Sequence, residues 1–322
     1  MLEISRVNDV RMKLINSGKY SDIFSVRSAH GRFAMKISYY SEDTIGKFID
    51  KKRSGDATGA VSEKNRDSIA VSEIFSKITK ALLNKKITPH FIRVIEEHDV
   101  KGFVSKIPGM HKRLKTLTVL EKMYNHVTFM ELFDTDLTAL LLKESLGDAD
   151  IRAIIFQVVY TLAAVQKTLP GFRHNDLSTN NVLVKVGGGC PARYEVDNTL
   201  YYTDTTYFVS ITDYDFVHVP RIGMLNNTRI TSGNYRVQGE TNASYDVHLF
   251  LKSFSKCLAR DNFEEAHETR AFLASLMLHS NDRFENEIHS LVPARLLAHA
   301  YFKPLQTPPG TPPAGPIPQY AF

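Results

Sequence analysis

The sequence has no tryptophan, only two cysteines and no apolar run long enough to cross a membrane. Two cysteines cannot build a disulfide framework, and the absence of Cys and His at ligand spacing argues against a structural zinc site. The opening residues MLEISRVNDV match neither a signal peptide nor a transit peptide. We therefore expect an intracellular protein without a membrane span.

Positive and negative charges are nearly balanced in this chain of 322 residues, with a formal net charge of +5. Hydrophobic residues make up 43% and charged residues 23%, which is typical of a soluble globular protein. The small positive excess suits a protein that binds ATP or an acidic partner. It suits an ordinary solvated surface equally well, and this is the simpler interpretation. The length is sufficient for two lobes.

The first part of the chain has the pattern of a β-sheet with one helix. Apolar and polar residues alternate in short runs, whereas 67–84 has apolar residues at helical spacing. The polar, charged segment 41–66 predicts a surface insertion. Strands are predicted as three runs within 11–40, and near 91–95, 102–107 and 126–133.

The pattern becomes helical from residue 136 onward. Helices are predicted over 136–146, 149–169 and 244–259, with short strands at 182–186 and 207–212. A strand-rich part followed by a helical part predicts an α+β, bilobal fold. We expect an N-lobe over 1–132, a C-lobe over 133–304 and a flexible, Pro-rich tail over 305–322.

The strongest functional signal is HNDLSTNNVLV at 174–184. Phosphoryl transfer requires a carboxylate that orients the attacking hydroxyl and accepts its proton, and an amide oxygen that holds magnesium. Asp176 and Asn181 supply these groups at the required spacing, directly before an apolar strand. The alternative is a polar turn that precedes a strand.

A second metal ligand is predicted in ITDYDF at 211–216. An apolar strand delivers Asp213, and an aromatic residue follows it. The alternative is an aspartate in a turn at the end of a strand. The motif comes one β-hairpin after the 174–184 loop, and this order favours the metal-binding interpretation.

Two stretches near the N-terminus match a phosphate-binding hairpin and the strand after it. INSGKYSDIFSV keeps one glycine, Gly18, between the apolar residues Ile15 and Ile23. Small residues at such a tip let backbone N–H groups approach phosphate oxygens. FAMK follows, with Ala34 and Lys36 on the next strand. A lysine on a strand is usually only solvent-exposed. The interpretation as a phosphate-binding region therefore rests on the order of the two stretches.

Taken in order, these motifs make residues 12–303 resemble the eukaryotic-type protein kinase superfamily. The strings HNDLSTNN and DYD most resemble the divergent serine/threonine-protein kinases of large DNA viruses. The stretch ARLLAHAYFKPL resembles the closing helix of protein kinases, and Asp246 fits the aspartate that opens their central large-lobe helix. The resemblance implies a bilobal enzyme that uses ATP with Mg²⁺ or Mn²⁺ and phosphorylates Ser or Thr in a protein substrate.

The resemblance also assigns roles to single residues. Lys36 would contact the α- and β-phosphates and form an ion pair with Glu73 on the 67–84 helix, with Glu63 as the alternative partner. Catalysis would depend on Asp176 as base and on Asn181 and Asp213 as metal ligands, together with Lys36 and Glu73.

The segment HVTFMELF resembles the hinge strand that binds adenine. Met130 would limit the depth of the pocket, the Glu131 carbonyl and the Phe133 amide would face the base, and Asp136 would reach the ribose. The predicted nucleotide-binding residues are Ile15, Gly18, Ile23, Ala34, Lys36, Met130, Glu131, Phe133 and Asp136. The resemblance further implies a monomer that needs no nucleic acid and works in the host cytoplasm or in a virion.

Four departures from the family pattern bear on specificity and regulation. Asn175 replaces the Arg before the catalytic Asp, Ser178 replaces a Lys, and Asp215 stands where a Gly is usual. A clear Ala-Pro-Glu is missing, and Glu240 is the nearest candidate.

Two other functions stay open from the sequence. His-Asn-Asp also occurs in choline- and aminoglycoside-type kinases, although the closing-helix motif and the hinge-like strand argue against a small-molecule kinase. A pseudokinase scaffold is the second alternative. The presence of Lys36, Asp176, Asn181 and Asp213 argues against it.

Overall fold

The structure is a computed structural model that describes most, but not all, of the chain. The described residues are 10–18, 21–40, 68–104, 107, 115–187, 191–225, 230, 242–259, 266–276, 278, 287–308 and 317–322. The predicted insertion at 41–66, with Glu63, and the Glu240 candidate lie outside them. Within the described residues, no helix combines the length and the apolar character that a membrane span requires.

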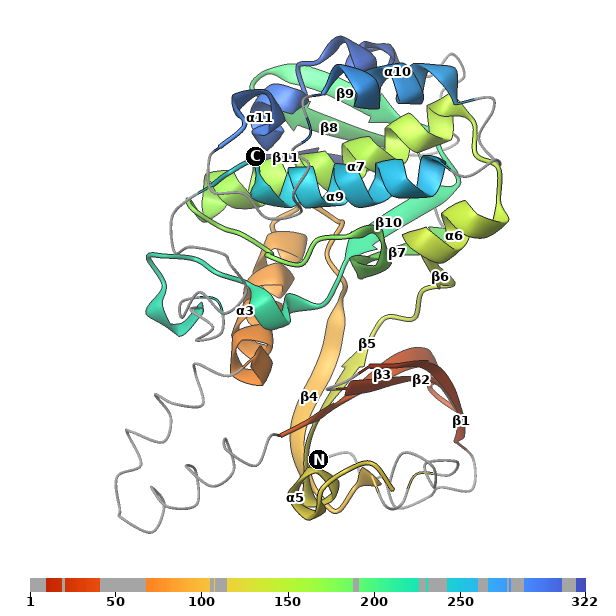
Figure 1. The fold of residues 1–322 in the computed structure, drawn as a ribbon, viewed down its shortest axis with the longest axis vertical. Coiled ribbons are helices and arrows are strands. Elements are labelled where there is room, and N and C mark those ends of the chain that lie inside the picture. The colour runs from red at the N-terminus through yellow and green to blue at the C-terminus, as the bar shows by residue number, and fades with distance from the viewer. Residues whose placement is uncertain are drawn as a thin grey trace. The chain divides into compact units, whose positions relative to one another are not determined.

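The chain divides into two compact units. The small unit comprises Met1–Ser76 and Arg93–Leu132, and the large unit comprises Lys77–Ile92 and Phe133–Phe322. Strands dominate the small unit and helices dominate the large one, which confirms the predicted bilobal α+β fold (Figure 1).

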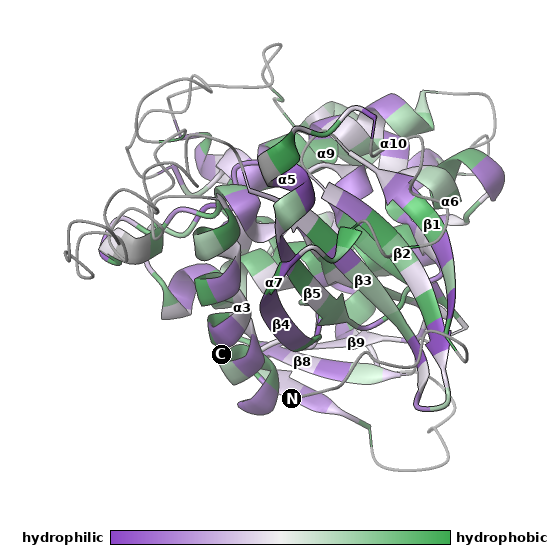
Figure 2. Cartoon of the chain, turned by 90° about the horizontal axis from the view of Figure 1, so that it is seen from below, coloured by the Kyte–Doolittle hydropathy of each residue, from purple (hydrophilic) through white to green (hydrophobic). Residues whose placement is uncertain are grey.

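The small unit is built on an antiparallel sheet of five strands in the order β1-β2-β3-β5-β4. Its core gathers on one face, where alternate residues such as Phe24, Met35, Ile37 and Val127 pack together. Figure 2 shows hydrophobic positions along β2, β3 and β5. The strands are β1 (Arg11–Ser17), β2 (Ser21–Ser28), β3 (Gly31–Tyr39), β4 (Val94–Lys101) and β5 (Tyr124–Met130).

The strands predicted near 91–95 and 102–107 are corrected by the structure. One strand, β4, runs from Val94 to Lys101 instead. Gly102 follows with a φ of 66°, which an L side chain rarely adopts, and its N–H donates to the Met123 carbonyl at 2.8 Å. The glycine therefore ends the strand at the point where the alternating pattern seemed to begin again.

Helix α3 runs from Ser68 to Asn84, as the helical spacing predicted. The spacing predicted a buried stripe of Ile69, Ile74, Ile78 and Leu82. However, Ile74 and Ile78 are only half-buried, whereas Val71 and Phe75 are fully buried. The end of α3 leads into a segment of the large unit. There the Ile92 N–H donates to the Ile211 carbonyl, and the Ile211 N–H donates to the His90 carbonyl. The predicted N-lobe range of 1–132 had included this segment.

The large unit is built around a buried helix, α7 (Asp148–Thr168), which packs against α9 (Tyr245–Leu258), as Figure 1 shows. A small sheet has the order β10-β7-β6, with β6 at Thr135–Asp136, β7 at Val182–Val186 and β10 at Tyr207–Ile211. The other α-helices among the described residues are α6 (Leu137–Lys143), α10 (His267–Ser275) and α11 (Pro293–Leu296), and a short α5 (Val119–Met123) belongs to the small unit.

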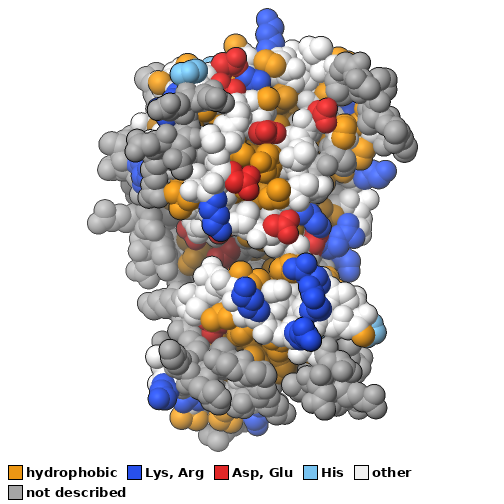
Figure 3. Space-filling view, turned by 90° about the vertical axis from the view of Figure 1, so that its right-hand side faces the viewer, with side chains coloured by type: hydrophobic (Ala, Val, Ile, Leu, Met, Phe, Trp, Pro, Cys, Tyr) orange, Lys and Arg blue, Asp and Glu red, His pale blue; other side chains and the backbone are white. Residues whose placement is uncertain are grey.

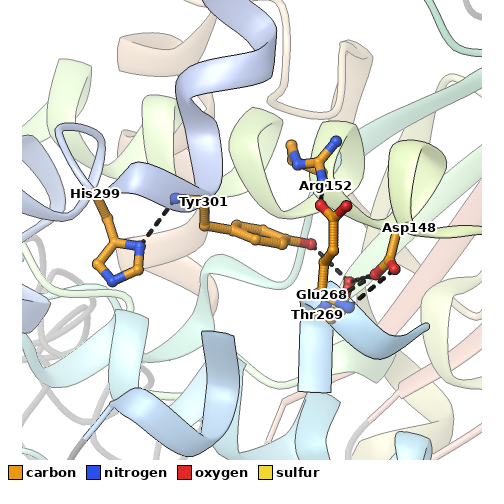
Figure 4. Close-up of polar contacts among 6 residues, drawn as sticks. All are labelled: Asp148, Arg152, Glu268, Thr269, His299 and Tyr301. Carbon is orange, nitrogen blue, oxygen red and sulfur yellow. Dashed lines mark hydrogen bonds and ion pairs between the residues drawn. The ribbon is translucent and has the colours of Figure 1, made fainter. Parts of the chain in front are cut away.

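Polar contacts join the start of α7 to α10 and to the closing segment (Figure 4). The Asp148 carboxylate accepts hydrogen bonds from the Thr269 N–H at 2.8 Å and from the Glu268 N–H at 3.0 Å. Thr269 Oγ1 lies 2.7 Å from the Tyr301 hydroxyl. Burial raises the pKa of Asp148, but the hydrogen bonds from Thr269 and Glu268 outweigh burial and hold this pKa below its usual value. These contacts fix the helices that surround α7.

The sequence predicted strands at 182–186 and 207–212 but missed a hairpin that lies between them, and so between β7 and β10. Strands β8 (Ala192–Val196) and β9 (Thr199–Thr203) are joined at Asp197 and Asn198, with φ values of 45° and 66°. Asp and Asn tolerate such angles and favour tight hairpin turns. The Asp-Asn pair between two alternating runs was the signal that could have predicted it.

Of the predicted flexible tail at 305–322, residues 309–316 lie outside the described part, and the structure corrects the prediction for the last residues. The last residues of the tail form β11 (Gln319–Ala321), which pairs in parallel with β8. The Phe322 ring lies 5.1 Å from that of Tyr160, and the Tyr320 ring lies 5.5 Å from that of Tyr194. Alternation of Gln, Tyr, Ala and Phe is a weak signal, and the proline-rich composition before it concealed the strand.

Removing residues 317–322 is expected to destabilise the large unit. Loss of two aromatic pairs corresponds to about 1–3 kcal/mol, or a fall in Tm of roughly 2–12 °C for a unit of this size. The substitution Ala321→Ser, at an exposed position of β11, serves as the control and is expected to leave Tm unchanged. Differential scanning calorimetry measures both, and an unchanged Tm after truncation would show that β11 contributes nothing.

Candidate active site

Asp176 and Asn181 are joined by hydrogen bonds within the large unit. Nδ2 of Asn181 donates to the backbone oxygen of Asp176 at 2.7 Å and to its carboxylate Oδ2 at 3.2 Å. Asn181 ends a short 3-10 turn, η3 (Thr179–Asn181), that leads into β7. With its nitrogen turned toward Asp176, the amide presents its oxygen to the other side, where Nδ2 of Asn180 lies 3.2 Å away.

The pairing of β7 with β10 brings Asp213 beside Asn181. Val182 lies opposite Ile211 in the ladder, and the Thr212 N–H donates to the Asn181 carbonyl at 3.1 Å. The chain then turns at Asp213, whose φ of 67° and ψ of 73° lie in the left-handed region, into the 3-10 turn η4 (Tyr214–Phe216). Both side chains therefore start from the same end of the β7–β10 strand pair.

The donor set of Asn181 and Asp213 fits a hard divalent cation. Both offer oxygen, and Mg²⁺ is usually held by one or two protein oxygens together with substrate phosphates and water. Among the described residues there is no cluster of three or more His, Cys, Asp or Glu that could hold a metal by itself.

Asp246, the first acidic residue of α9, holds the loop that carries Asp176. Its Oδ2 accepts the His174 N–H at 2.7 Å and its Oδ1 accepts the Asn175 N–H at 2.9 Å. The side chain is buried, with only 1% of its surface exposed. Burial raises the pKa of Asp246, against the opposing effects of the His174 side chain, the two N–H donors and the Arg173 charge.

Two further hydrogen bonds tie this loop to the turn at Asp213. Nε2 of His174 donates to the Thr212 carbonyl at 2.9 Å, which fixes the hydrogen on that nitrogen. Nδ2 of Asn175 donates to the Phe216 carbonyl at 2.8 Å. Sequence reasoning treated Asn175 only as a missing arginine, whereas the structure gives its amide a structural role between the loop with Asp176 and the turn at Asp213.

A buried cationic group beside the loop was missed from the sequence. Arg173 is 3% exposed, and its guanidinium lies 5.8 Å from the centre of the Tyr245 ring. Burial lowers the pKa of Arg173, although Asp246 and Tyr245 oppose this. Burial and the Arg173 charge also lower the pKa of His218 to about 4, so His218 stays neutral at physiological pH. The arginine directly before His-Asn-Asp was the available signal.

In the small unit, four of the predicted nucleotide-binding residues share the sheet face opposite the core. Ile23 pairs with Lys36 across β2 and β3, and Ala34 pairs with Met130 across β3 and β5. Ile15 is 53% exposed at an irregularity of β1. The backbone turns back at Gly18, where the N–H donates to the Ser21 carbonyl at 2.8 Å.

The other predicted residues have local structural partners. The Glu131 N–H donates to the Arg93 carbonyl at 3.0 Å in the small unit. In the large unit, Phe133 is buried and stacks against Phe208, and the Asp136 carboxylate caps α6 by accepting the Ala139 N–H at 2.8 Å. The ribose and adenine contacts of these residues stay predictions.

Glu73 lies half-buried on α3. Its predicted ion pair with Lys36 also stays a prediction.

The small unit has a five-stranded antiparallel sheet, and in the helical large unit the loop with Asp176 and Asn181 lies next to the turn at Asp213. Together these features define a protein-kinase-like protein. A family model described as "Poxvirus serine/threonine protein kinase" matches residues 118–304, which is more than half of the chain. The chain therefore belongs to the poxvirus serine/threonine protein kinase family. This confirms the resemblance to the divergent kinases of large DNA viruses.

The chain is also similar to a protein of Acanthamoeba polyphaga mimivirus that carries the name of a serine/threonine-protein kinase. The two are 22% identical over 294 residues, which cover 80% of this chain and 58% of the relative. The chain thus spans little more than half the length of this relative.

Proposed function

We propose that the chain is an ATP-dependent protein kinase that transfers the γ-phosphate to Ser or Thr hydroxyls of a protein substrate inside the infected cell. The observation that carries this proposal is the hydrogen-bonded pair of Asp176 and Asn181 at the same end of the β7–β10 strand pair as Asp213. Membership of a serine/threonine protein kinase family supports it.

The residues of the large unit would act on the acceptor hydroxyl. The hydroxyl oxygen forms a bond to the γ-phosphorus while the bond from that phosphorus to the β–γ bridging oxygen breaks, so that ADP leaves. The Asp176 carboxylate orients the hydroxyl and accepts its proton. Asn181, through its amide oxygen, and Asp213, through its carboxylate, would hold Mg²⁺ or Mn²⁺, which neutralises charge on the phosphates when bound.

The residues of the small unit would hold the nucleotide. Lys36 supplies a cation for the α- and β-phosphates, and Gly18 lets the backbone of the β1–β2 turn approach a phosphate. Ala34 and Met130, which pair across β3 and β5, offer an apolar surface to adenine. Asp136, which belongs to the large unit, has a carboxylate oxygen left beyond its capping bond for a ribose hydroxyl.

The main competing function is a kinase for a small alcohol. The test is incubation of the purified chain with γ-labelled ATP and Mg²⁺, in separate reactions with basic proteins and with a panel of choline-like and aminoglycoside-like alcohols. We expect label in protein and none in the alcohols. Label transferred to an alcohol but not to protein would reject the proposal in favour of the small-molecule function.

Lys36→Met should lower kcat/KM for ATP by about 10²–10³-fold, because it removes a cation from the phosphates. The side chain points away from the core face of the sheet, so Tm should be nearly unchanged. The exposed Lys80 provides the matched control, and Lys80→Met should leave kcat/KM at the parental value. Parental activity in Lys36→Met would remove Lys36 from the nucleotide site.

Phosphatase treatment should leave the initial rate unchanged. An arginine before the catalytic aspartate can pair with a phosphate on the activation loop, through strong bidentate hydrogen bonds. Here Asn175 occupies that position and its amide already bonds to the Phe216 carbonyl, so no charge has to be drawn into place. A tenfold loss, about 1.4 kcal/mol of activation free energy, that rephosphorylation reverses would contradict this expectation.

A further inference from the structure

Four basic side chains gather on one face of the small unit's sheet. The ladder places Arg11 opposite Arg27, and Arg27 opposite Arg32, so that one arginine from each of β1, β2 and β3 forms a row across the strands. Lys13 follows Arg11 at the distance of two residues and so lies on the same face. All four are exposed. Figure 3 shows Lys and Arg side chains gathered over this part of the surface.

We call Arg11, Lys13, Arg27 and Arg32 the basic row. Their mutual repulsion makes the basic row electrostatically unfavourable in the protein alone. Like charges directly opposite each other on neighbouring strands are destabilising. Among the residues that the structure describes, none of the four is paired with an Asp or Glu side chain. Charged side chains on an edge strand prevent sheets from associating edge to edge, and this would account for Arg11 and Lys13 on β1. It does not account for Arg27 and Arg32, whose strands have neighbours on both sides.

The basic row lies on the same face as the predicted nucleotide-binding residues but at a separate place. On β3, Arg32 precedes Lys36 by two same-face steps, with Ala34 between them. At about 3.3 Å per residue this separates the two by roughly 13 Å along the strand. An anion held by the arginines would therefore lie beside the phosphates that Lys36 contacts and would not replace them.

The chemistry of the face favours an acidic protein segment over a nucleic acid. Proteins that bind single strands use aromatic side chains on which the bases stack. Along β1, β2 and β3, the described residues that share this face include no aromatic side chain: Arg11, Lys13, Ser21, Ile23, Ser25, Arg27, Arg32, Ala34, Lys36 and Ser38. The three arginines also span only about 10 Å, since neighbouring strands lie about 4.8 Å apart. That is a short contact for a duplex, which usually engages several phosphates.

We propose that the basic row is a docking site for an extended, Asp- or Glu-rich segment of a partner protein. A guanidinium group presents a planar pair of donors that matches a carboxylate, and three such groups in line suit successive acidic side chains of an extended peptide. Binding of that segment offsets the repulsion within the row. The proposal goes beyond phosphoryl transfer and does not depend on it.

Binding of a defined peptide to the full chain tests this docking site. The probe is a fluorescein-labelled peptide of alternating Glu and Ser, followed by fluorescence anisotropy at low and high salt. The variant Arg11→Ser, Arg27→Ser, Arg32→Ser should weaken binding at least about tenfold. The control Lys143→Ser, Arg295→Ser, Lys303→Ser removes the same charge from exposed positions of the large unit and should bind like the parent.

A second variant keeps the test independent of folding. Arg27→Gln removes only the middle charge, so it should raise Tm at low salt, lose this gain at high salt, and still weaken peptide binding. Three results would overturn the proposal: no binding of the Glu peptide by the parent chain, equal loss in the control variant, or preferential binding of an oligothymidylate that the triple-arginine variant loses.

Discussion

Replacing Asp176 by asparagine is expected to lower kcat by about 10²–10⁴-fold, the usual contribution of a general base. This corresponds to roughly 3–5 kcal/mol of activation free energy. The amide has nearly the same shape as the carboxylate, so the contact with Asn181 can persist and Tm should change little. Affinity for ATP should also persist, because the base acts on the acceptor hydroxyl.

The control for Asp176→Asn is Asp204→Asn, which makes the same chemical change at an exposed position of the large unit. Initial rates at saturating ATP and protein substrate should match the parent for Asp204→Asn. A kcat within a few-fold of the parent for Asp176→Asn would show that Asp176 is not the base.

Replacing Asp246 by alanine is expected to be the most destabilising single change near the site. It leaves the N–H groups of His174 and Asn175 without their acceptor in a buried place, at about 1–3 kcal/mol each. A total of about 2–6 kcal/mol is a large part of the stability of an ordinary protein. The loop that carries Asp176 should also lose its position, so kcat should fall together with Tm.

Asp246→Asn separates the loss of hydrogen bonds from the loss of shape. One amide oxygen can still accept one of the two N–H groups, so Tm and kcat should lie between those of the parent and of Asp246→Ala. Asp204→Ala removes an exposed carboxylate of the large unit at a position without a positive φ, and it should change Tm by less than a degree or two. Thermal unfolding gives Tm and initial rates give kcat for all three variants. Parental Tm and kcat in Asp246→Ala would show that the Asp246 carboxylate does not position the loop.

The sequence predicted most of the regular elements, because their periodicity and turn residues agree with each other. The three strands of 11–40, helix α3 and helices α6, α7 and α9 all appear within a few residues of their predicted bounds. The failures have local causes. Gly102 ended a strand inside an alternating run, and β11 was hidden by the proline-rich composition before it.

The sequence indicated the parts of the candidate site whose residues lie close together in the chain. It did not indicate the contacts between residues that are far apart in the chain. The spacing of Asp176 and Asn181 placed both on one short segment, and the hydrogen bonds that join them there come from the structure. The hydrogen bonds from Asn175 to Phe216 and from His174 to Thr212 join segments about 40 residues apart in the chain. The periodicity of the sequence does not predict such contacts. The same holds for His90 and Ile92, whose bonds to Ile211 hold the strand that delivers Asp213.

The phosphoamino acid content of a labelled protein substrate tests the proposed kinase activity most directly. Purified chain, γ-labelled ATP, Mg²⁺ and a basic protein are incubated, and the labelled protein is hydrolysed and separated. We expect phosphoserine or phosphothreonine with the parent chain and only background label with Asp176→Asn. Absence of label with the parent chain, or equal label with Asp176→Asn, would contradict the assignment of this loop as the catalytic site of a protein kinase.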